Sequence, residues 1–379
     1  MFAYFDNSST TQPAQEVIET VNRLLTKTWG NPSSLHDIGI SAEEEMTKAR
    51  GILTRAFGGS RDEIIFTSGG TESDNLAIRG SLLAKRQKHI ITTSVEHPAV
   101  LNVYQQMEQE GYRVTYLEVD ENCEIDYNQL SDAVGTDTAL VSIMAVNNET
   151  GHIFDIGRAG HIIKEKNPET YFFVDGVQGF SKVRQDLSNV DMYSVSGHKI
   201  HGMKGIGCLY KKKSVRILPI VYGGGQEKNI RSGTENMPGI AALGTAAELS
   251  LSHLEEHFAD MQKKKQAFLN KLQSTVSDIV VNGSSTCPYI LNLSFLGVKS
   301  EVLLHTLEGY GIYVSSGSAC SSKKGGQSHV FKAMKKSPAE TDSAIRFSFS
   351  RYNTMEQMDY CAEILAEQVP KLRRVMGKR

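Results

Sequence analysis

The chain has 379 residues, of which 40% are hydrophobic and 22% are charged. This length allows a large core divided between about two domains. Lys and Arg number 41 against 43 Asp and Glu, so the formal net charge is only −2. The protein therefore lacks an overall field that would draw it to nucleic acid or to an anionic membrane, and we expect no direct partner of either kind.

The N-terminus has no basic start followed by an apolar core, so it does not predict a signal peptide. No window approaches the roughly 18 consecutive apolar residues that a membrane helix requires. A cytoplasmic location is the expectation that follows. The five cysteines are widely spread and form no CxxC pair, which argues against a disulfide framework and a structural zinc site, and we expect no metal.

A turn-like polar segment over residues 6–11 precedes two helices, which we expect from Pro13 to about residue 25 and over residues 42–57. Strands and helices then alternate up to residue 195. This alternation predicts an α/β fold, with a mostly parallel sheet flanked by helices. The expected strands are residues 63–67, 89–93, 113–119, 138–146, 171–174 and 192–195, and the helix after the first strand spans about residues 72–88.

The pattern changes after Tyr210. A long loop over residues 223–234 leads to a long helical region over residues 240–276. Short strands and helices beyond about residue 280 predict a smaller α+β domain. We place the large domain at residues 15–255 and the small domain at residues 1–14 and 256–379.

The segment from residue 190 to residue 210 holds a lysine in an unusual setting. A β-prone run ends at the polar corner Ser196-Gly197-His198, Lys199 follows, and a glycine-rich turn comes next. A Schiff-base lysine suits such a place, because partial burial lowers the pKa of the amine and frees its lone pair. A surface lysine in a β-turn is the alternative that this segment alone leaves open.

Gly70 and Thr71 lie at a turn between a predicted strand and a predicted helix. Backbone N–H groups, the helix dipole and the Thr71 hydroxyl together suit a phosphate group there, although a well-capped helix is an equal explanation. No Walker lysine follows, so a nucleoside triphosphate is disfavoured. Ser196 and His198 precede Lys199 closely enough to donate to the same phosphate.

Asp175 ends an apolar strand, and Gln178 follows three residues later. A carboxylate in this position either caps a helix or keeps a pyridinium nitrogen protonated, as pyridoxal phosphate requires. Ligand groups gather at the carboxyl ends of strands in parallel sheets. Lys199, Asp175 and a phosphate cup at these ends together predict a pyridoxal 5′-phosphate site.

Three further residues are candidates for the same site. His97 follows a strand and either stacks its imidazole on a cofactor ring or is a hydrogen-bonded loop histidine. Asn148 follows another strand and offers an amide donor to ring or substrate oxygens. Arg346 is a lone cation in an apolar strand, where it binds either a substrate carboxylate in bidentate geometry or a structural acidic partner.

A polar segment over residues 315–326 carries one cysteine, Cys320, among small residues and next to Lys323 and Lys324. Exposure and positive charge favour the thiolate form. Cys208, in contrast, lies in an apolar run that is typical of a structural cysteine. We therefore predict that Cys320 is a reactive thiol that travels between a buried site and an outside acceptor.

Long ordered motifs connect these candidates. They are DNSSTT, GNPSSLH, IIFTSGGTESDNLAI, EHPAVL, VNNETG, VDGVQ, SGHKIHGMKGIG, GGGQEKNIRSGTEN, SSGSACSS and IRFSFSRYNT. In these motifs, and over nearly its whole length, the chain closely resembles the cysteine desulfurases, which form part of the class V aminotransferase branch of fold type I pyridoxal phosphate enzymes.

The resemblance implies a homodimer with its active site near the subunit interface. It implies that Lys199 is the Schiff-base lysine, that Asp175 binds the ring nitrogen and Gln178 the ring hydroxyl, and that His97 covers the ring face and takes part in catalysis. The other cofactor-binding residues that it implies are Gly70, Thr71, Asn148, Ser196, Gly197, His198 and, from the partner subunit, Thr234. The substrate-binding residues that it implies are Asn31, Asn148 and Arg346.

Four positions depart from the commonest family pattern. Gly70 and Gly176 stand where alanine is usual, Ala145 where an aromatic residue or histidine is usual, and Met203 where proline is usual. None of these changes removes a functional side chain. We expect looser turns and an altered fit to substrate or partner.

The activity that the resemblance implies is conversion of L-cysteine to L-alanine, with the sulfur captured as a persulfide on Cys320 and passed to an acceptor protein. An iron–sulfur scaffold and a tRNA sulfurtransferase both fit as the acceptor. A selenocysteine lyase shares such a site without depending on the thiol. A catalytically idle paralogue is disfavoured, because Lys199 and Cys320 are both present.

Overall fold

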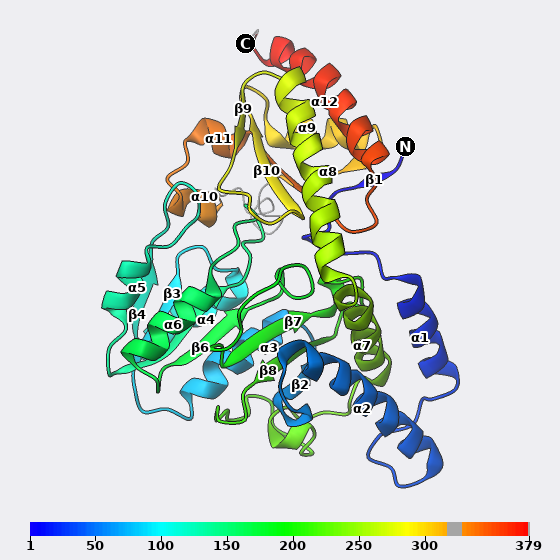
Figure 1. Ribbon diagram of the computed structural model, residues 1–379, viewed down its shortest axis with the longest axis vertical. Coiled ribbons are helices and arrows are strands. Elements are labelled where there is room, and N and C mark those ends of the chain that lie inside the picture. The colour runs from blue at the N-terminus through cyan, green and yellow to red at the C-terminus, as the bar shows by residue number, and fades with distance from the viewer. Residues whose placement is uncertain (317–327, 378–379) are drawn as a thin grey trace.

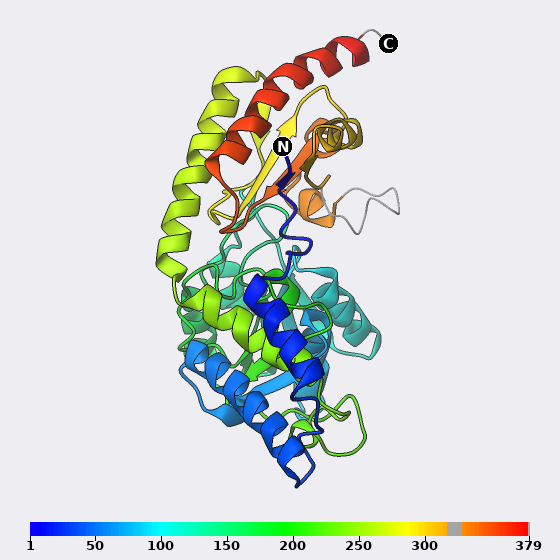
Figure 2. The ribbon, with the colours of Figure 1, turned by 90° about the vertical axis from the view of Figure 1, so that its right-hand side faces the viewer.

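The computed structural model describes residues 1–316 and 328–377 of the chain (Figure 1). The described residues form two lobes, each built around its own sheet. The lower lobe in Figure 1 contains a seven-stranded sheet and the upper lobe a three-stranded sheet. Helix α8 (Leu254–Thr275) runs from one lobe to the other, and Figure 2 shows it along one side of the molecule.

The large sheet is mostly parallel, as the alternation of strands and helices predicts. Within it, β8 runs antiparallel to both of its neighbours, β2 and β7. Residues 197–206 connect β7 to β8, and they are too few for the crossover that a parallel pair needs. In spatial order the strands are β2 (Ile64–Thr67), β8 (Gly207–Lys211), β7 (Met192–Ser196), β6 (Tyr171–Asp175), β5 (Thr138–Met144), β3 (His89–Thr93) and β4 (Arg113–Leu117).

The large sheet is buried on both faces, because alternate side chains enter two separate hydrophobic clusters. Ile90 and Leu140 belong to the cluster that includes helix α4, whereas Ile91 and Val141 belong to the larger cluster on the other face. The helices of this lobe are α1 (Gln15–Thr26), α2 (Asp37–Phe57), α3 (Gly70–Asn75), α4 (Pro98–Gln109), α5 (Tyr127–Ala133), α6 (Ile156–Lys166) and α7 (Met237–Leu251).

Several predicted helix boundaries are wrong. Helix α2 begins at Asp37, five residues before the predicted start at residue 42, because the imidazole of His36 accepts a hydrogen bond from Gly39 N and caps the helix. Helix α3 continues into a π-helical turn (Leu76–Gly80), and helical structure ends well before residue 88. The carbonyl of Gly80 accepts from Leu218 N, which ties the end of this helix to a neighbouring segment.

The predicted long helix over residues 240–276 is two helices, α7 and α8. His253 has φ −131° and ψ 30°, which interrupts the helix and lets the chain change direction between the lobes. Strands β4 and β5 each end two residues before the predicted end. Val119 and Val146 instead make isolated bridges, to Ile125 and Ile153, within local turns.

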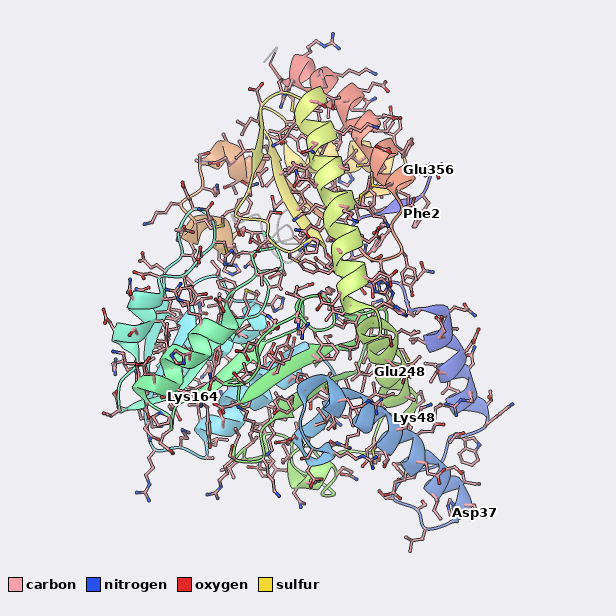
Figure 3. All side chains as sticks on the ribbon, viewed as in Figure 1. Phe2, Asp37, Lys48, Lys164, Glu248 and Glu356 are labelled. Carbon is pink, nitrogen blue, oxygen red and sulfur yellow. The ribbon has the colours of Figure 1, made fainter. Side chains whose placement is uncertain are left out.

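The upper lobe contains an antiparallel sheet in the order β12-β10-β9, formed by β9 (Ile279–Val281), β10 (Ile290–Phe295) and β12 (Ala344–Ser348). The N-terminus joins this lobe, since β1 (Ala3–Tyr4) pairs with β11 (Ile312–Tyr313). Gln357 also donates to the carbonyl of Phe2, and Figure 3 shows Phe2 close to Glu356. The remaining helices are α9 (Ser300–Glu308), α10 (His329–Ala333), α11 (Pro338–Asp342) and α12 (Met355–Met376).

Over the described ranges, none of the helices combines the length and the apolar character that crossing a bilayer demands. The same residues contain no group of three or more His, Cys, Asp or Glu side chains arranged to hold a metal ion. Four cysteines in the described part of the chain, Cys123, Cys208, Cys287 and Cys361, are buried and unpaired.

Candidate active site

A cavity of about 250 Å³ lies where β5, β6 and β7 end. Strands of a parallel sheet present their carboxyl ends at one edge, which is where such sheets usually bind ligands. Nine of the predicted site residues line this cavity: Gly70, Thr71, His97, Asn148, Asp175, Gln178, Ser196, His198 and Lys199. Ser8, Asp74, Met144, Val146 and Val177 also line it and were not predicted.

Lys199 lies in the short 3-10 turn (Gly197–Lys199) that follows β7. Its side chain is partly buried, and Nζ donates to the carbonyls of Ser8 and Ser9, the latter at 2.8 Å. Burial, together with the charges of Lys182 and Arg346, lowers the pKa of Lys199 to about 7. The surface-lysine alternative is therefore wrong, since this amine lines a cavity and is substantially neutral at physiological pH.

Asp175 ends β6 at the base of the cavity. Its Oδ1 accepts from Val177 N at 3.0 Å and from the Ser194 hydroxyl at 3.5 Å. Residues 177–180 form turns, so the alternative that Asp175 caps a helix is wrong. Burial raises the pKa of Asp175, and a cation placed against this carboxylate would favour its charged form.

Two further carboxyl groups, Asp74 and Glu96, lie close to Asp175 and are almost completely buried. Burial, reinforced by the charge of Asp175, raises the pKa of Glu96 to about 8 and that of Asp74 above its usual range. One oxygen of each group has no hydrogen-bond partner among the described residues. The sequence shows both acids inside motifs, but nothing in the local pattern indicates that they are buried together.

His97 is the N-cap of α4, and Pro98 occupies the first helical position. Its Nδ1 accepts from Ala99 N at 3.1 Å, so the ring proton of the neutral imidazole lies on Nε2. Burial lowers the pKa of His97, which favours this neutral form. The structure thus places a neutral flat ring in the cavity wall, and His97 is hydrogen-bonded as well.

The polar corner after β7 and the start of α3 meet at the cavity. A Cβ added at Gly70 would lie 2.6 Å from Val177 and 3.7 Å from Ser196, so the backbone of α3 comes close to the turn after β6 and to the end of β7. His198 contacts the Thr10 hydroxyl through Nδ1 at 3.2 Å, and burial lowers its pKa to about 4. Hydroxyl, imidazole and backbone N–H groups together provide the donors that a phosphate needs.

The N-terminal segment over residues 6–11 closes one side of the cavity. The carbonyl of Ser8 accepts from Lys199 Nζ and from Gln178 Nε2, the latter at 2.9 Å. Gln178 Oε1 in turn accepts from Lys182 Nζ at 3.1 Å. The sequence contains the motif DNSSTT, but its contact with Lys199, 190 positions after Ser9, depends on the tertiary fold.

Arg346 lies in β12 and is 2% exposed, beside the cavity and outside its lining residues. It donates to Asn148 O at 3.0 Å, to Ser9 Oγ at 2.8 Å and to Asp6 Oδ1 at 2.9 Å. The structural salt bridge that the sequence left open is therefore present. Nε of Arg346 has no partner within the described part of the chain, which leaves one buried donor available.

Besides Arg346, three predicted residues that the structure describes do not line the cavity: Gly197, Asn31 and Thr234. Gly197 is buried directly behind its wall, in the turn that carries Lys199. Asn31 lies in the exposed loop between α1 and α2, where Oδ1 accepts from Ser33 N, and Thr234 is exposed in the loop before α7. Cys320 lies outside the described residues.

The structure explains one departure from the family pattern. A Cβ added at Gly176 would lie 1.7 Å from Cε1 of Tyr193, which is a buried residue of β7. The glycine therefore makes room for a large neighbour beneath the turn that follows Asp175. We predicted a looser turn here, and instead Gly179 N and Phe180 N both donate to the Gly176 carbonyl.

The residues of the cavity fit pyridoxal 5′-phosphate. They provide a substantially neutral amine, a buried carboxylate with a raised pKa, a flat neutral imidazole and a corner of phosphate donors. The buried unpartnered oxygen of Asp74, a lining residue, shows that the polar groups here are not all satisfied by the chain itself.

Comparisons with known proteins show the family to which the chain belongs. The model of the aminotransferase class-V family matches residues 3–361. A cysteine desulfurase of Trichormus azollae is 44% identical over 375 residues, covering 98% of this chain and 93% of the relative. A putative cysteine desulfurase, IscS 1 of Bacillus subtilis, is 40% identical over 376 residues, covering 97% of this chain and 99% of the relative.

Solved structures show the same similarity. A NifS-like protein superimposes with a TM-score of 0.92 at 37% identity, covering 98% of this chain and all of that one. A NifS-like protein from Rickettsia africae gives a TM-score of 0.86 at 29% identity, covering 98% of this chain. The predicted fold class is confirmed. The chain belongs to the aminotransferase class-V family and, within it, to the cysteine desulfurases, fold type I enzymes that use pyridoxal 5′-phosphate.

Proposed function

We propose that the protein converts L-cysteine to L-alanine, captures the sulfur as a persulfide on Cys320 and passes it to a protein acceptor. The observation that carries this proposal is Lys199, an amine whose pKa is lowered to about 7, in one cavity with Asp175 and His97. A group with a pKa near the working pH both accepts and returns a proton efficiently. Lys199 Nζ therefore takes the Cα proton of the substrate.

Pyridoxal phosphate, when bound, supplies an aldehyde for the substrate amine and a ring that accepts the electrons released when the Cα proton leaves. Asp175 holds the ring nitrogen, because its buried carboxylate is stabilised by a positive charge beside it. His97 covers one face of the ring, and Gln178 donates to the ring hydroxyl. The phosphate is bound by the corner formed by Gly70, Thr71, Ser196, Gly197 and His198, which supplies backbone and side-chain donors.

Arg346 and Asn148 bind the carboxylate of the substrate. Arg346 is buried, and its unpartnered Nε offers a charge-assisted hydrogen bond to an incoming carboxylate. Asn148 lines the cavity, and the backbone of the same residue is already held by Arg346. Their contact explains how a residue of the small sheet acts on a cavity in the large one.

Cys320 is the sulfur acceptor in this proposal. Its thiolate attacks the substrate sulfur, the C–S bond breaks with its electron pair on carbon, and a proton then completes alanine. The described residues on either side of its segment lie beside the cavity. Ser315 pairs with the backbone of Arg346, and Ser328 Oγ donates to Glu149 Oε2 at 2.6 Å, next to Asn148.

A homodimer is supported by large apolar side chains that are exposed between residues 18 and 40. Leu35 is 96% exposed and Trp29 is 67% exposed, and Ile18, Leu25, Ile38 and Ile40 are exposed in the same region. A second copy would remove this surface from water. Thr234, which is exposed and outside the cavity, then belongs to the phosphate site of the partner. Asn31 lies within the same apolar region.

The acceptor is either an iron–sulfur scaffold or a tRNA sulfurtransferase. Both receive sulfur from a persulfide, and the near-neutral net charge of −2 gives no reason to expect direct binding of nucleic acid. The pathway is decided by tracing labelled sulfur from cysteine to the proteins that co-purify with the chain.

The test is Cys320→Ala, with Cys361→Ala as the control for loss of a buried thiol. We expect the Cys320 variant to bind the cofactor and show its visible absorbance, but to lose persulfide formation from labelled cysteine. The Cys361 variant should retain both. Full alanine production by Cys320→Ala would contradict the role of this thiol and favour a lyase that does not need it.

A further inference from the structure

A second, smaller cavity of about 30 Å³ adjoins the first, and Lys199 lines both. Its lining includes Lys182 from the turns after β6, His201 from the segment after β7 and Arg351 from the segment after β12. No Asp or Glu is among the residues that line it. A cavity whose only charged groups are cations is the feature to be explained.

Lys182 is partly buried, and Nζ donates to the neutral acceptor Gln178 Oε1 at 3.1 Å. Within the described residues, no Asp or Glu oxygen lies within 4.0 Å of this ammonium. The acidic group that acts on it is the Cys287 thiol, and burial raises the pKa of that thiol, so it carries no charge. Burial lowers the pKa of Lys182 to about 8, which leaves it mainly protonated at neutral pH.

Arg351 has no carboxylate partner either in the part of the chain that the structure describes. Its guanidinium donates to Ser250 Oγ at 2.7 Å and to the Tyr352 hydroxyl at 3.1 Å, and it lies 4.9 Å from the centre of the Tyr352 ring. His201 and His257 also line the cavity. Burial lowers the pKa of both imidazoles, so both are mainly uncharged at neutral pH. Two cations therefore share one small cavity, and none of the described residues that line it supplies a carboxylate.

The size and the polar groups of the cavity limit what can fill it. A volume of 30 Å³ exceeds the roughly 10–15 Å³ that one water needs, and it matches a single halide-sized ion or about two waters. Ser181, another lining residue, has a buried hydroxyl oxygen with no partner among the described residues. We propose that this cavity binds a small monovalent inorganic anion such as chloride, held by Lys182, Arg351 and the Ser181 hydroxyl next to Lys199.

Such an anion would act on the amine that lines both cavities. Lys182 is one of the cations whose charge lowers the pKa of Lys199, and it acts in the same direction on His198 and His201. An anion beside Lys182 cancels part of this field and therefore holds the proton on Lys199 more tightly. This consequence rests on the proposed role of Lys199, whereas anion binding itself does not.

Anion binding is tested by the chloride NMR linewidth with the full chain loaded with cofactor. Chloride replaces gluconate, an organic anion too large for the cavity, at constant ionic strength. The variants are Lys182→Met and Arg351→Met, and the control is Lys213→Met, which removes an exposed lysine outside the cavity. Melting curves establish that each protein is folded.

We expect saturable line broadening with the unchanged chain and with the Lys213 variant. Loss of one charged donor should weaken chloride binding by about tenfold or more in both cavity variants. Absence of saturable broadening in the unchanged chain, or unchanged affinity in folded Lys182→Met and Arg351→Met, would overturn the site.

The coupling to Lys199 has its own test, in which cofactor-free chain captures pyridoxal phosphate at neutral pH. We expect capture to be slower in chloride than in gluconate, because more Lys199 is protonated, and we expect this difference to disappear in Lys182→Met. Equal rates in the two salts, with line broadening retained, would overturn the coupling and leave the anion site standing.

Discussion

Lys265, which is buried, and Lys199, which is partly buried, lie in different parts of the molecule and make similar hydrogen bonds. Lys265, on α8, is 8% exposed and donates to the carbonyls of Ser285 and Cys287. Lys199 also donates to two backbone carbonyls. Burial lowers the pKa of Lys265 to about 8 and, with neighbouring cations, that of Lys199 to about 7.

The difference lies in what surrounds each amine. Lys265 lines neither of the two cavities described above, and its ammonium holds the loop at residues 285–287 against α8. Lys199 lines both cavities, and the charges of Lys182 and Arg346 act on it. Burial alone thus lowers the pKa of a lysine. A cavity beside the amine and the charges of neighbouring cations are the further features that make the neutral amine reactive toward a ligand.

The largest expected effect on activity is the loss of the Lys199 amine, and removal of the Lys265 amine is the matched comparison. Lys199→Ala should lower alanine production by about 10³-fold, because a positioned base commonly contributes about 10²–10⁴-fold, and it should also abolish covalent attachment of the cofactor. Lys265→Met should leave the rate of alanine production within about twofold, because Lys265 lines neither of the two cavities.

The comparison fails if both variants lose activity equally while they remain folded. Alanine is measured by its release from L-cysteine, and attachment of the cofactor by reduction with borohydride followed by mass spectrometry. A melting curve for each variant separates loss of chemistry from loss of structure.

A second pair of variants extends the comparison from bases to acids. Asp175 lines the cavity, whereas Asp191, also buried, pairs with Lys164 Nζ at 2.5 Å and precedes the first residue of β7, at the opposite end of that strand from the cavity-lining Ser196. Asp175→Asn should lower activity by about 10²-fold, the usual effect of removing one preorganised electrostatic partner. Asp191→Asn should instead lower the free energy of unfolding, by up to about 3 kcal/mol, because the partly buried ammonium of Lys164 loses its carboxylate partner.

Visible absorbance separates the two outcomes. Asp175→Asn should shift the spectrum of the bound cofactor, because the charge beside the ring nitrogen changes. Unchanged spectrum and activity in that variant would remove Asp175 from the site.

The pH dependence of the rate of cofactor capture tests whether neighbouring cations lower the pKa of Lys199. Only the neutral amine attacks an aldehyde, so the rate should rise with pH through about 7 and fall about tenfold for each unit below it. A free lysine derivative should show the same rise near its ordinary pKa of 10.5. Lys182→Met should move the midpoint of the chain upwards, because it removes one of the cations that lower the pKa of Lys199. An unmoved midpoint would show that the charge of Lys182 does not contribute to the lowered pKa of Lys199.

The sequence predicts the sheet well, because its strands and helices alternate and every strand except the edge strand β4 is almost entirely buried. It also contained enough to predict that β8 is antiparallel, since residues 197–206 cannot form a crossover helix. The break between α7 and α8 was harder to predict from the sequence. Both sides of His253 carry helix-forming residues, and the change of direction is set by the position of the second lobe.

The site was predictable where one residue follows one strand, as for Lys199, Asp175 and His97, because parallel strands bring such residues to one edge. It was not predictable where two distant segments meet. Asp6 and Arg346 are 340 residues apart and form an ion pair, and local pattern gives no sign of it. Asp74 and Glu96 were missed for a related reason, since burial of an acid is a property of the packed core.

The smallest effect concerns Lys265 and the pH dependence of stability. The folded amine loses its proton near pH 8, whereas the unfolded chain keeps it to about 10.5, so the unfolded state binds more protons between these values. Stability contributed by this group therefore rises with pH across that window. Lys265→Met removes this rise and leaves the carbonyls of Ser285 and Cys287 without their donor, a cost of about 1–3 kcal/mol.

The free energy of unfolding of Lys265→Met should consequently fall further below that of the unchanged chain as pH increases from 8 to 10.5. Urea unfolding across that window measures it, with Lys263→Met on the exposed face of α8 as the control. A deficit that stays constant would mean that Lys265 keeps its proton in the folded state, and the two lysines would then differ in basicity as well as in surroundings. If the difference in the free energy of unfolding widens, both lysines have a lowered pKa, and the cavities and cations around Lys199 are then what makes that lysine the reactive one.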